Sequence, residues 1–275
     1  MAPRGLRNFG VHAILALCAI SVVLPVAWIA LAALKTQIAL LQGDLQFTPH
    51  LGNFHELLFS RTSDYVRHFG NSLLVASLST LLVLVISTFA AYSLARLRWP
   101  AWVPVVVLTG SLVFHMIPPI TLTGPWYVMF RTIGWDSSYA ALIATHVALH
   151  LPIGIAVMYV FVREIPRELE EAARLDGCTT PQMLARIVFP LVKPGLAATG
   201  ILVFVFSWNE FAVALNLTSS PTATVPVAIA KFAQEYEIKH GVMAAGAVLS
   251  IVPAVLLLLF AQRHIVKGLT AGSGK

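Results

Sequence analysis

The sequence predicts an all-α, polytopic membrane protein with six transmembrane helices, and two observations lead to this fold class. Of the 275 residues, 58% are hydrophobic and only 11% are charged, whereas charged residues make up about a quarter of a soluble domain. So few charges cannot cover a surface exposed to water, and so apolar a chain does not remain disordered. The apolar residues also fall into six long stretches, and about 20 apolar residues in a helix cross the hydrocarbon core of a bilayer.

The six stretches predict the transmembrane helices of a single transmembrane domain, 1–275. Their expected bounds are 11–34, 72–95, 101–119, 138–162, 195–217 and 241–262. The third is interrupted by Pro118 and Pro119, so we expect a helix to about Ile117 and then an irregular exit, because proline cannot continue a helix. The fifth contains one acidic residue, Glu210, and the sixth contains Pro253, where a bend is expected.

The distribution of Lys and Arg predicts the orientation. With the N-terminus inside, the cytoplasmic segments hold twelve of these residues and the outer segments hold six. Because cytoplasmic loops of membrane proteins carry the excess of basic residues, both termini are expected in the cytoplasm of a multi-pass protein of the cell (inner) membrane. The formal net charge of +6 therefore reflects topology, and no dense basic patch indicates nucleic acid as a partner.

The N-terminal stretch has an alternative reading as a secretory signal peptide. Arg4 and Arg7 would form its basic region, with a small-residue cleavage site near 30–32. Such peptides have an apolar region of about 7–15 residues, and this stretch of 24 residues is longer. A retained first helix is expected.

The predicted cytoplasmic loop 163–193 is unusually rich in charge, with ten of the 30 charged residues of the chain. Pro166 suits a first helical turn, Gly177 suits a left-handed helix end, and Thr180 with Pro181 suits the start of a second helix that ends near Phe189. The loop is expected to form a helix, a glycine turn and a helix. From these signals alone, an amphipathic pair lying on the lipid headgroups is an equally good interpretation.

The same loop carries a known pattern of residues at fixed spacing. These residues are Glu171, Ala172, Ala173, Gly177, Ile187 and Pro190. The pattern resembles the EAA loop of ABC importer permeases, which reads Glu-Ala-Ala, three residues, Gly, nine residues and Ile-x-Leu-Pro. Phe189 stands where that pattern has Leu, an exchange between apolar residues.

In that family, the EAA loop forms coupling helices that dock on a separate ATPase subunit. The resemblance therefore implies an ATPase-coupling set: Glu171, Ala172, Ala173, Asp176, Gly177, Ile187 and Pro190. Glu171 would meet a basic group of the ATPase and Gly177 would permit the turn. The alternative for Glu171 is an ion pair within its own helix, with Arg174 or Arg167. ATP and Mg²⁺ would be bound by the partner ATPase, and no cofactor is expected in this chain.

Two further segments resemble the carbohydrate importers of the maltose type. These are 206–211, similar to their Trp-Asn-Glu-Phe segment, and 261–272, similar to their C-terminal tail. The resemblance implies a type I ABC importer permease fold and one half of a pore for a mono-, di- or oligosaccharide. The implied partners are a second permease, two ATPase subunits and an extracytoplasmic sugar-binding protein. In that family the tail reaches the ATPase, but residues 272–275 depart from the usual ending.

Three residues of the fifth stretch are candidates for the translocation path: Trp208, Asn209 and Glu210. An ionised acid costs at least a few kcal/mol at the centre of a bilayer, so it faces a polar path or a helix contact when it is retained. Alternatively, the helix ends nearby and Glu210 is solvated at the outer interface.

Other functions are disfavoured by the sequence. His146 and His150 are four residues apart, but a metal site needs a third ligand, so a polar helix contact or packing is expected. Gly274 and Lys275 end no P-loop, because Leu269 stands where glycine is required. An intramembrane protease would need a nucleophile or metal motif that the chain lacks. A permease for another small polar solute and an ion-coupled secondary transporter remain as alternatives, although the latter commonly shows internal repeats.

Overall fold

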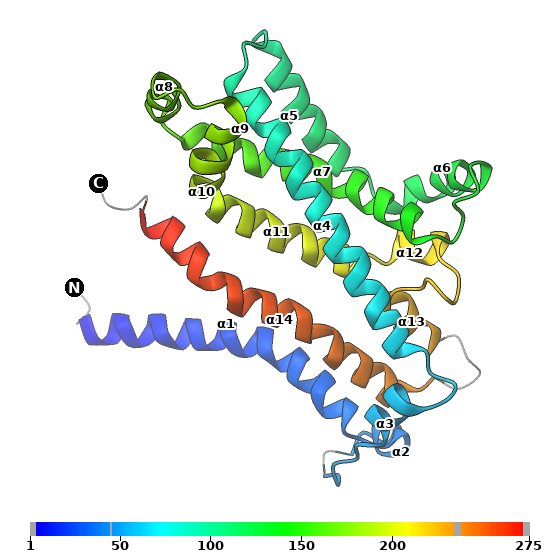
Figure 1. The fold of residues 1–275 in the computed structure, drawn as a ribbon. Coiled ribbons are helices and arrows are strands. Elements are labelled where there is room, and N and C mark those ends of the chain that lie inside the picture. Colours follow the sequence, from blue (N-terminus) through cyan, green and yellow to red (C-terminus); the bar gives the residue numbers. More distant parts are fainter. Residues whose placement is uncertain (1–3, 45, 234–237, 272–275) are drawn as a thin grey trace. The chain divides into compact units, whose positions relative to one another are not determined.

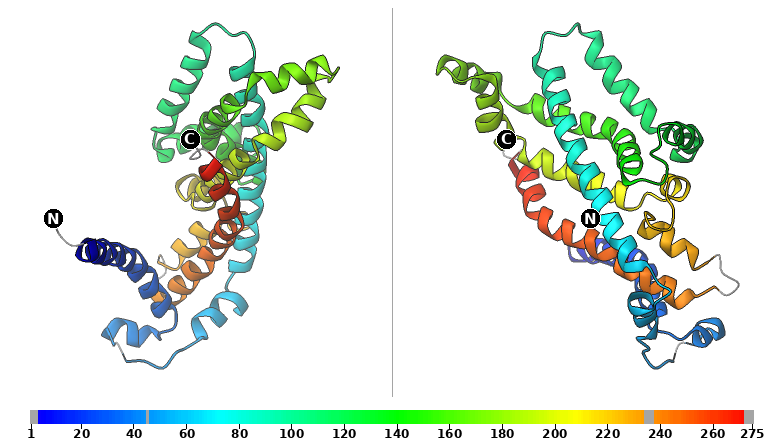
Figure 2. Two further views of the ribbon diagram at one scale, coloured as in Figure 1. Left: turned by 90° about the vertical axis from the view of Figure 1, so that its left-hand side faces the viewer. Right: turned by 45° about the vertical axis from the view of Figure 1, so that its right-hand side comes forward.

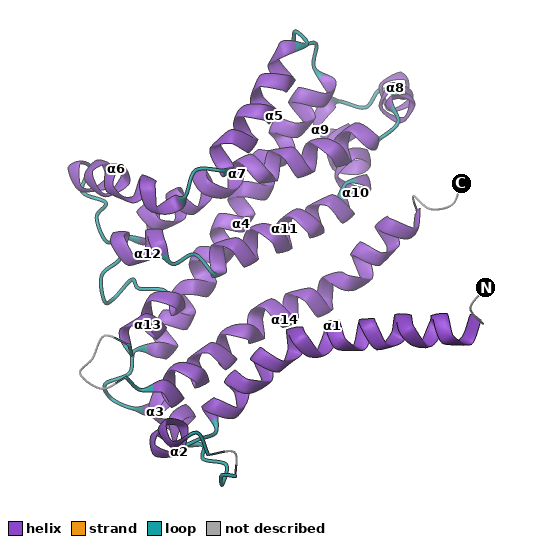
Figure 3. Ribbon diagram, turned by 180° about the vertical axis from the view of Figure 1, so that it is seen from behind, coloured by secondary structure: helices purple, strands orange, loops and turns teal. Residues whose placement is uncertain are grey.

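The structure is a computed structural model that describes residues 4–44, 46–233 and 238–271, with side chains described only within 11–257 and at 259. The described residues form helices joined by loops and turns, with no strand among them (Figure 3). The predicted all-α fold class is therefore confirmed. Four of these helices are long and apolar enough to cross a membrane: α1 (Arg4–Ala33), α4 (Tyr65–Arg96), α7 (Tyr139–Glu164) and α14 (His240–Ala271) (Figure 1).

Two bent helix pairs bring the number of candidate spans up to six. In the first pair, α5 (Trp102–His115) and α6 (Pro119–Thr132) meet at 96°. In the second pair, the helical segment Thr180–Leu191 meets α11 (Lys193–Trp208) at 72°. The predicted number of six is reached when each bent pair is one span.

The helices within the expected third and fifth spans differ from the sequence prediction. After α5 the chain does not continue irregularly, because Pro118 ends one helix and Pro119 starts the next as the first residue of α6, where a missing N–H costs nothing. The fifth stretch is not one helix: α11 ends at Trp208, and α12 (Ala212–Leu217) begins after a break at 209–211.

One compact unit comprises residues 1–66 and 228–252. It contains α1, α2 (Gln37–Gln42), α3 (Gly52–Phe59) and the first part of α14. Polar contacts join parts of this unit that are distant in the sequence. The Tyr65 hydroxyl donates to the carbonyl oxygen of Gly246 in α14 (2.9 Å), and Lys239 Nζ lies 2.8 Å from Glu56 Oε1 in α3. The side chains of α1 from Val11 onward are mostly exposed, as expected for a helix that faces lipid.

The other compact unit comprises residues 67–227 and 253–275, and it holds the candidate sites. Its helices are most of α4, then α5, α6, α7, α8 (Arg167–Leu175), α9 (Thr180–Met183), α10 (Phe189–Leu191), α11 and α12, with the start of α13 (Val225–Lys231) and the rest of α14. The segment Leu184–Val188 between α9 and α10 is π-helical. Two clusters of buried apolar side chains lie at opposite ends of α7, one around Leu142 and one around Met158.

Helices α4 and α7 approach closely at Gly154. A Cβ atom at this position would lie 2.7 Å from Val83 Cγ1 and 3.2 Å from the Ser87 Cβ. Small residues at helix contacts allow close approach, which matters in lipid because packing rather than the hydrophobic effect holds spanning helices together. Gly154 thereby fixes the position of α7, whose two ends carry the two sites described next.

Candidate functional site

The loop that the sequence singled out folds as two helical segments around a glycine turn. Helix α8 follows Pro166 and ends at Gly177, which adopts φ +78° and donates its N–H to the carbonyl oxygen of Arg174 (3.1 Å). The next N–H, of Cys178, bonds to the carbonyl oxygen of Ala173 (2.9 Å). These bonds satisfy the last carbonyls of α8, as the sequence predicted for the glycine.

The second helical segment starts one residue earlier and ends later than expected. Thr179, not Thr180, is the cap, and its N–H is bound by the Gln182 side chain (2.9 Å) in a capping box. The helix continues past Pro190 to Leu191. Just before this proline, the hydrogen-bonding pattern changes to that of a π-helix, in which the Phe189 N–H bonds five residues back, to the carbonyl oxygen of Leu184. Pro190 is the second residue of α10 and so lies in its first turn, where the missing N–H is tolerated.

Helix α8 has an inner and an outer face, and it projects beyond the ends of α4 and α7 (Figure 2). Glu170 and Ala173 are buried on the inner face. Glu171 and Ala172 are exposed on the outer face, and the Leu175 side chain at the end of α8 is 90% exposed. The outer face of α8 therefore presents a carboxylate and an apolar side chain to its surroundings.

A buried ion pair anchors the inner face to the membrane helices. Arg96 Nε lies 2.5 Å from Glu170 Oε1, and both side chains are at most 6% exposed. The Tyr92 hydroxyl donates to Glu170 Oε2 (3.0 Å), and Arg96 Nη2 donates to the carbonyl oxygens of Val162 and Ile165 (3.0 and 2.7 Å). Arg96 thus joins the ends of α4, α7 and α8.

Sequence reasoning treated Glu170 and Arg96 only as loop charges. A signal for the pair was available, since Glu170 shares the helix face of the apolar Ala173 and an acid on an apolar face needs a partner. Nothing in the sequence named Arg96 as that partner.

The predicted coupling residues divide between the two faces of the loop. Ala173 is buried and Ile187 is half-buried against the apolar cluster around Met158. The other members are exposed: Glu171, Ala172, Asp176, Gly177 and Pro190. The motif therefore includes residues that shape the loop and residues free to meet a partner.

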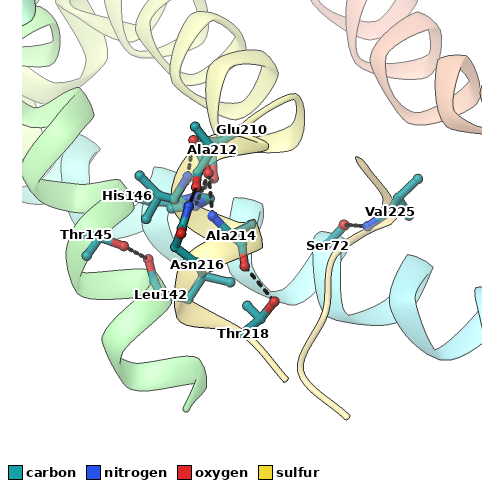
Figure 4. A network of polar contacts seen from close by, with 12 residues as sticks. Ser72, Leu142, Thr145, His146, Glu210, Ala212, Ala214, Asn216, Thr218 and Val225 are labelled. Carbon is teal, nitrogen blue, oxygen red and sulfur yellow. Dashed lines mark hydrogen bonds and ion pairs between the residues drawn. The ribbon is translucent and has the colours of Figure 1, made fainter. Parts of the chain in front are cut away.

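The break in the fifth stretch is organised by Glu210. Its carboxylate accepts the N–H groups of Val213 (2.8 Å) and Ala214 (2.9 Å), at the start of α12. Glu210 Oε2 also lies 3.7 Å from His146 Nε2, and His146 Nδ1 lies 2.6 Å from Ser207 Oγ (Figure 4). His146 therefore makes the polar contact between helices that the sequence predicted, and the buried Glu210 is not at a solvated helix end.

The three predicted path residues have different surroundings. Trp208 is buried between the rings of Phe204 (centroids 5.8 Å apart) and Phe69 (5.4 Å). Asn209 is exposed, and its Nδ2 donates to the carbonyl oxygen of Val205 (2.8 Å). Of the three, only Asn209 presents its side chain to an open surface.

A cavity of about 670 Å³ opens beside the break, between α5, α7 and α11. We call it the histidine cavity, and six of its lining residues are Phe114, His115, His150, Phe206, Asn209 and Phe211. In the part of the chain that is described, no three His, Cys, Asp or Glu side chains are grouped to hold a metal ion.

Comparison with known proteins places these features in one family. The sequence signature described as "Binding-protein-dependent transport system inner membrane component" matches residues 83–271, which include the 163–193 loop, Asn209 and the histidine cavity. The chain belongs to this family. It is therefore an inner-membrane permease subunit of a binding-protein-dependent ABC importer, as its loop pattern predicted.

Similar permeases are found in bacteria and archaea. The chain is 36% identical to the trehalose transport system permease protein SugB of Mycobacterium tuberculosis, over 92% of each chain. It is 34% identical to the trehalose/maltose transport system permease protein MalG of Thermococcus litoralis, over 94% of each. A permease structure from a bacterial ABC transporter that imports alginate superposes with a TM-score of 0.78 at 19% identity, covering 96% of this chain and 98% of that one. The fold is therefore that of ABC importer permeases.

Proposed function

We propose that this binding-protein-dependent permease forms one half of a heterodimeric pore for ATP-driven uptake of a sugar. The named relatives support a sugar, since they are permeases of transport systems for trehalose and for trehalose and maltose. The observation that carries the proposal is the exposed outer face of α8, where Glu171 and Leu175 are open to a partner while Glu170 holds the inner face.

The outer face of α8 is the proposed contact with one of two ATPase subunits, which would bind ATP and Mg²⁺. A Glu171 carboxylate that meets a basic group in a desolvated interface forms a charge-assisted hydrogen bond, which is stronger than a solvated pair. Closure of the ATPase dimer would move α8, and the Arg96–Glu170 pair would carry that movement to α4 and α7. Rocking of the two pore halves then gives alternating access. This chain itself makes and breaks no covalent bond.

The remaining partners follow from the proposed orientation, with both termini in the cytoplasm. The extracytoplasmic segments 35–70 and 218–240 would receive a sugar-loaded binding protein, and Asn209 would face the translocation path. The C-terminal residues 272–275, considered for an ATPase contact, lie outside the described residues.

The substitution Glu171→Lys tests the coupling proposal, because it reverses the charge on the outer face of α8 without disturbing a buried contact. We expect this variant to lose sugar uptake and sugar-stimulated ATP hydrolysis, while the amount of permease in the membrane stays normal. Glu168→Lys is the matched control, since Glu168 is exposed on the same helix but outside the motif. Full uptake with normal ATPase stimulation in the Glu171 variant would refute the coupling role.

Affinity purification in mild detergent tests the assembly. The chain should bring down a second permease and an ATPase. Uptake by the purified chain alone would instead support the secondary-transporter alternative. That alternative needs an ion-coupling carboxylate, but both oxygens of Glu210 already accept backbone N–H groups.

A further inference from the structure

The histidine cavity has the size and character of a small-molecule site. Its volume of about 670 Å³ falls within the range of about 300–1,000 Å³ that is typical of ligand pockets. Its walls are mostly apolar or aromatic, and the polar groups are few: His115, His150, Asn209 and Glu210. Such walls with a few placed polar groups are usual for sites that bind and orient a ligand.

His150 is the observation that points to a ligand. The residue is only 6% exposed, and it lines the cavity. Neither of its ring nitrogens has a hydrogen-bond partner among the described residues. A buried polar group without a partner is costly, so a ligand hydroxyl that reaches His150 would gain a hydrogen bond that the protein does not supply.

Aromatic rings provide the other half of the recognition surface. The Phe206 ring lies 6.1 Å from the His115 ring and 5.9 Å from the His150 ring, measured between centroids. The side chains of Phe206 and Phe211 remain 37% and 39% exposed. An exposed aromatic face bordered by hydrogen-bonding groups suits a molecule with one C–H face and a hydroxyl edge, because aromatic rings bind apolar surface at low entropic cost.

The charge of the cavity favours a neutral ligand. Glu210 is its only acidic lining residue, and both carboxylate oxygens are engaged by the N–H groups of Val213 and Ala214. No Lys or Arg lines the cavity. An anion would therefore find no basic counter-charge in the lining, and a cation would meet a carboxylate whose two oxygens each already accept a backbone N–H.

We propose that the histidine cavity is a saccharide subsite in this chain, in which His150 and Asn209 hydrogen-bond sugar hydroxyls and Phe206 packs on a C–H face of the sugar ring. The proposal rests on the proposed sugar import and deepens it, because it assigns sugar contacts to this subunit. Asn209 is suited to its role because the bond to Val205 orients the amide at the break between α11 and α12.

The test uses the complete transporter in proteoliposomes with its binding protein. Uptake is first compared for trehalose and maltose, and the better substrate is then compared with its monodeoxy analogues. The variants are His150→Leu and Asn209→Ala. Asn216→Ala is the matched control: its Nδ2 donates four residues back, to Ala212 (2.7 Å), as Asn209 does to Val205, but it lies outside the cavity.

The measured quantity is the ratio of variant to wild-type uptake for each sugar, in which the selectivity of the binding protein cancels. For the parent sugar, each cavity variant should lower uptake about fivefold to tenfold, the usual effect of one hydrogen bond. For the analogue that lacks the hydroxyl bound by that residue, the ratio should return to about one. Asn216→Ala should leave every ratio near one.

The subsite would be overturned if the ratio of variant to wild-type uptake were the same for the parent sugar and all analogues, whether near one or reduced. A residue that acts only in packing or coupling would affect all of these sugars equally, whichever hydroxyl they lack. Failure of the wild type to import any mono-, di- or oligosaccharide, with trehalose and maltose tried first, would overturn the proposed sugar import instead, and the subsite with it.

A second substitution distinguishes a ligand cavity from a surface that packs against the partner permease. Ala212→Trp fills the cavity without removing a polar group, whereas Leu215→Trp places the same indole side chain outside it. Ala212→Trp should lower disaccharide uptake at least fivefold relative to Leu215→Trp, with the partner permease still copurifying. Loss of the partner from the Ala212 variant alone would overturn the proposal.

Discussion

Glu170 and Glu171 are adjacent in the sequence, yet they have opposite surroundings. Successive residues of a helix point about 100° apart, so α8 buries one carboxylate and exposes the other. Glu170 is held by Arg96 and Tyr92, and Glu171 faces outward. We infer that the first glutamate positions the coupling loop and that the second meets the ATPase.

Glu170→Ala should destabilise the protein strongly. It leaves the Arg96 guanidinium buried without its carboxylate, and removing one partner of a buried pair costs about 3–5 kcal/mol. Thermal unfolding of the purified transporter should show a lower Tm than for Glu168→Ala, in which an exposed acid is removed from the same helix. Equal Tm values for the two variants would contradict the anchoring role.

Gly177→Val should impair coupling through the backbone alone. Gly177 has φ +78°, and nothing lies within 4 Å of a Cβ built there, so the expected cost of about 1–2 kcal/mol comes from the left-handed conformation. Gly177→Asn should be milder, because Asn tolerates this conformation. Sugar-stimulated ATPase activity is the measurement, and the assignment fails if the Val and Asn variants behave alike.

At the scale of elements, prolines and one acid decide where helices begin. Pro119 begins α6 after a 96° bend, and Pro190 lies in the first turn of α10, directly after a π-helical segment. Glu210 gives α12 its beginning by accepting two backbone N–H groups. The same break exposes Asn209 beside the histidine cavity.

The contact of α4 with α7 should be sensitive to a single methyl group. Gly154→Ala places a Cβ 2.7 Å from Val83 Cγ1, and overpacking of this kind costs about 1–3 kcal/mol. Gly110→Ala in α5 is the matched control: it has open space around its Cβ, and replacing a helical glycine by alanine gains about 0.5–1 kcal/mol. Thermal unfolding should therefore change in opposite directions, and a shift of the same sign in both variants would refute the close packing.

At the scale of the whole molecule, the family to which the chain belongs consists of inner-membrane components, so its apolar helices lie in the inner membrane. From the excess of Lys and Arg we predict that the 163–193 loop lies in the cytoplasm. The segment after α12 would then lie on the opposite side. The orientation decides which end of the permease can meet an ATPase.

Cysteine labelling tests this orientation. In a chain with Cys18 and Cys178 replaced by serine, Glu168→Cys and Ser219→Cys introduce single thiols at exposed positions. A membrane-impermeant maleimide should label Ser219→Cys in spheroplasts and Glu168→Cys in inside-out vesicles. The reverse pattern would contradict cytoplasmic termini.

The sequence by itself determined the fold class, the family and the glycine turn of the coupling loop. These depend on apolar stretches and on residues at fixed local spacing, which are present in the chain before it folds. The tertiary structure decided which distant side chains meet: Arg96 with Glu170, His146 with Ser207 and Glu210, and His150 with the ring of Phe206. These contacts join residues whose pairing depends on how helices pack, and no local spacing records that packing.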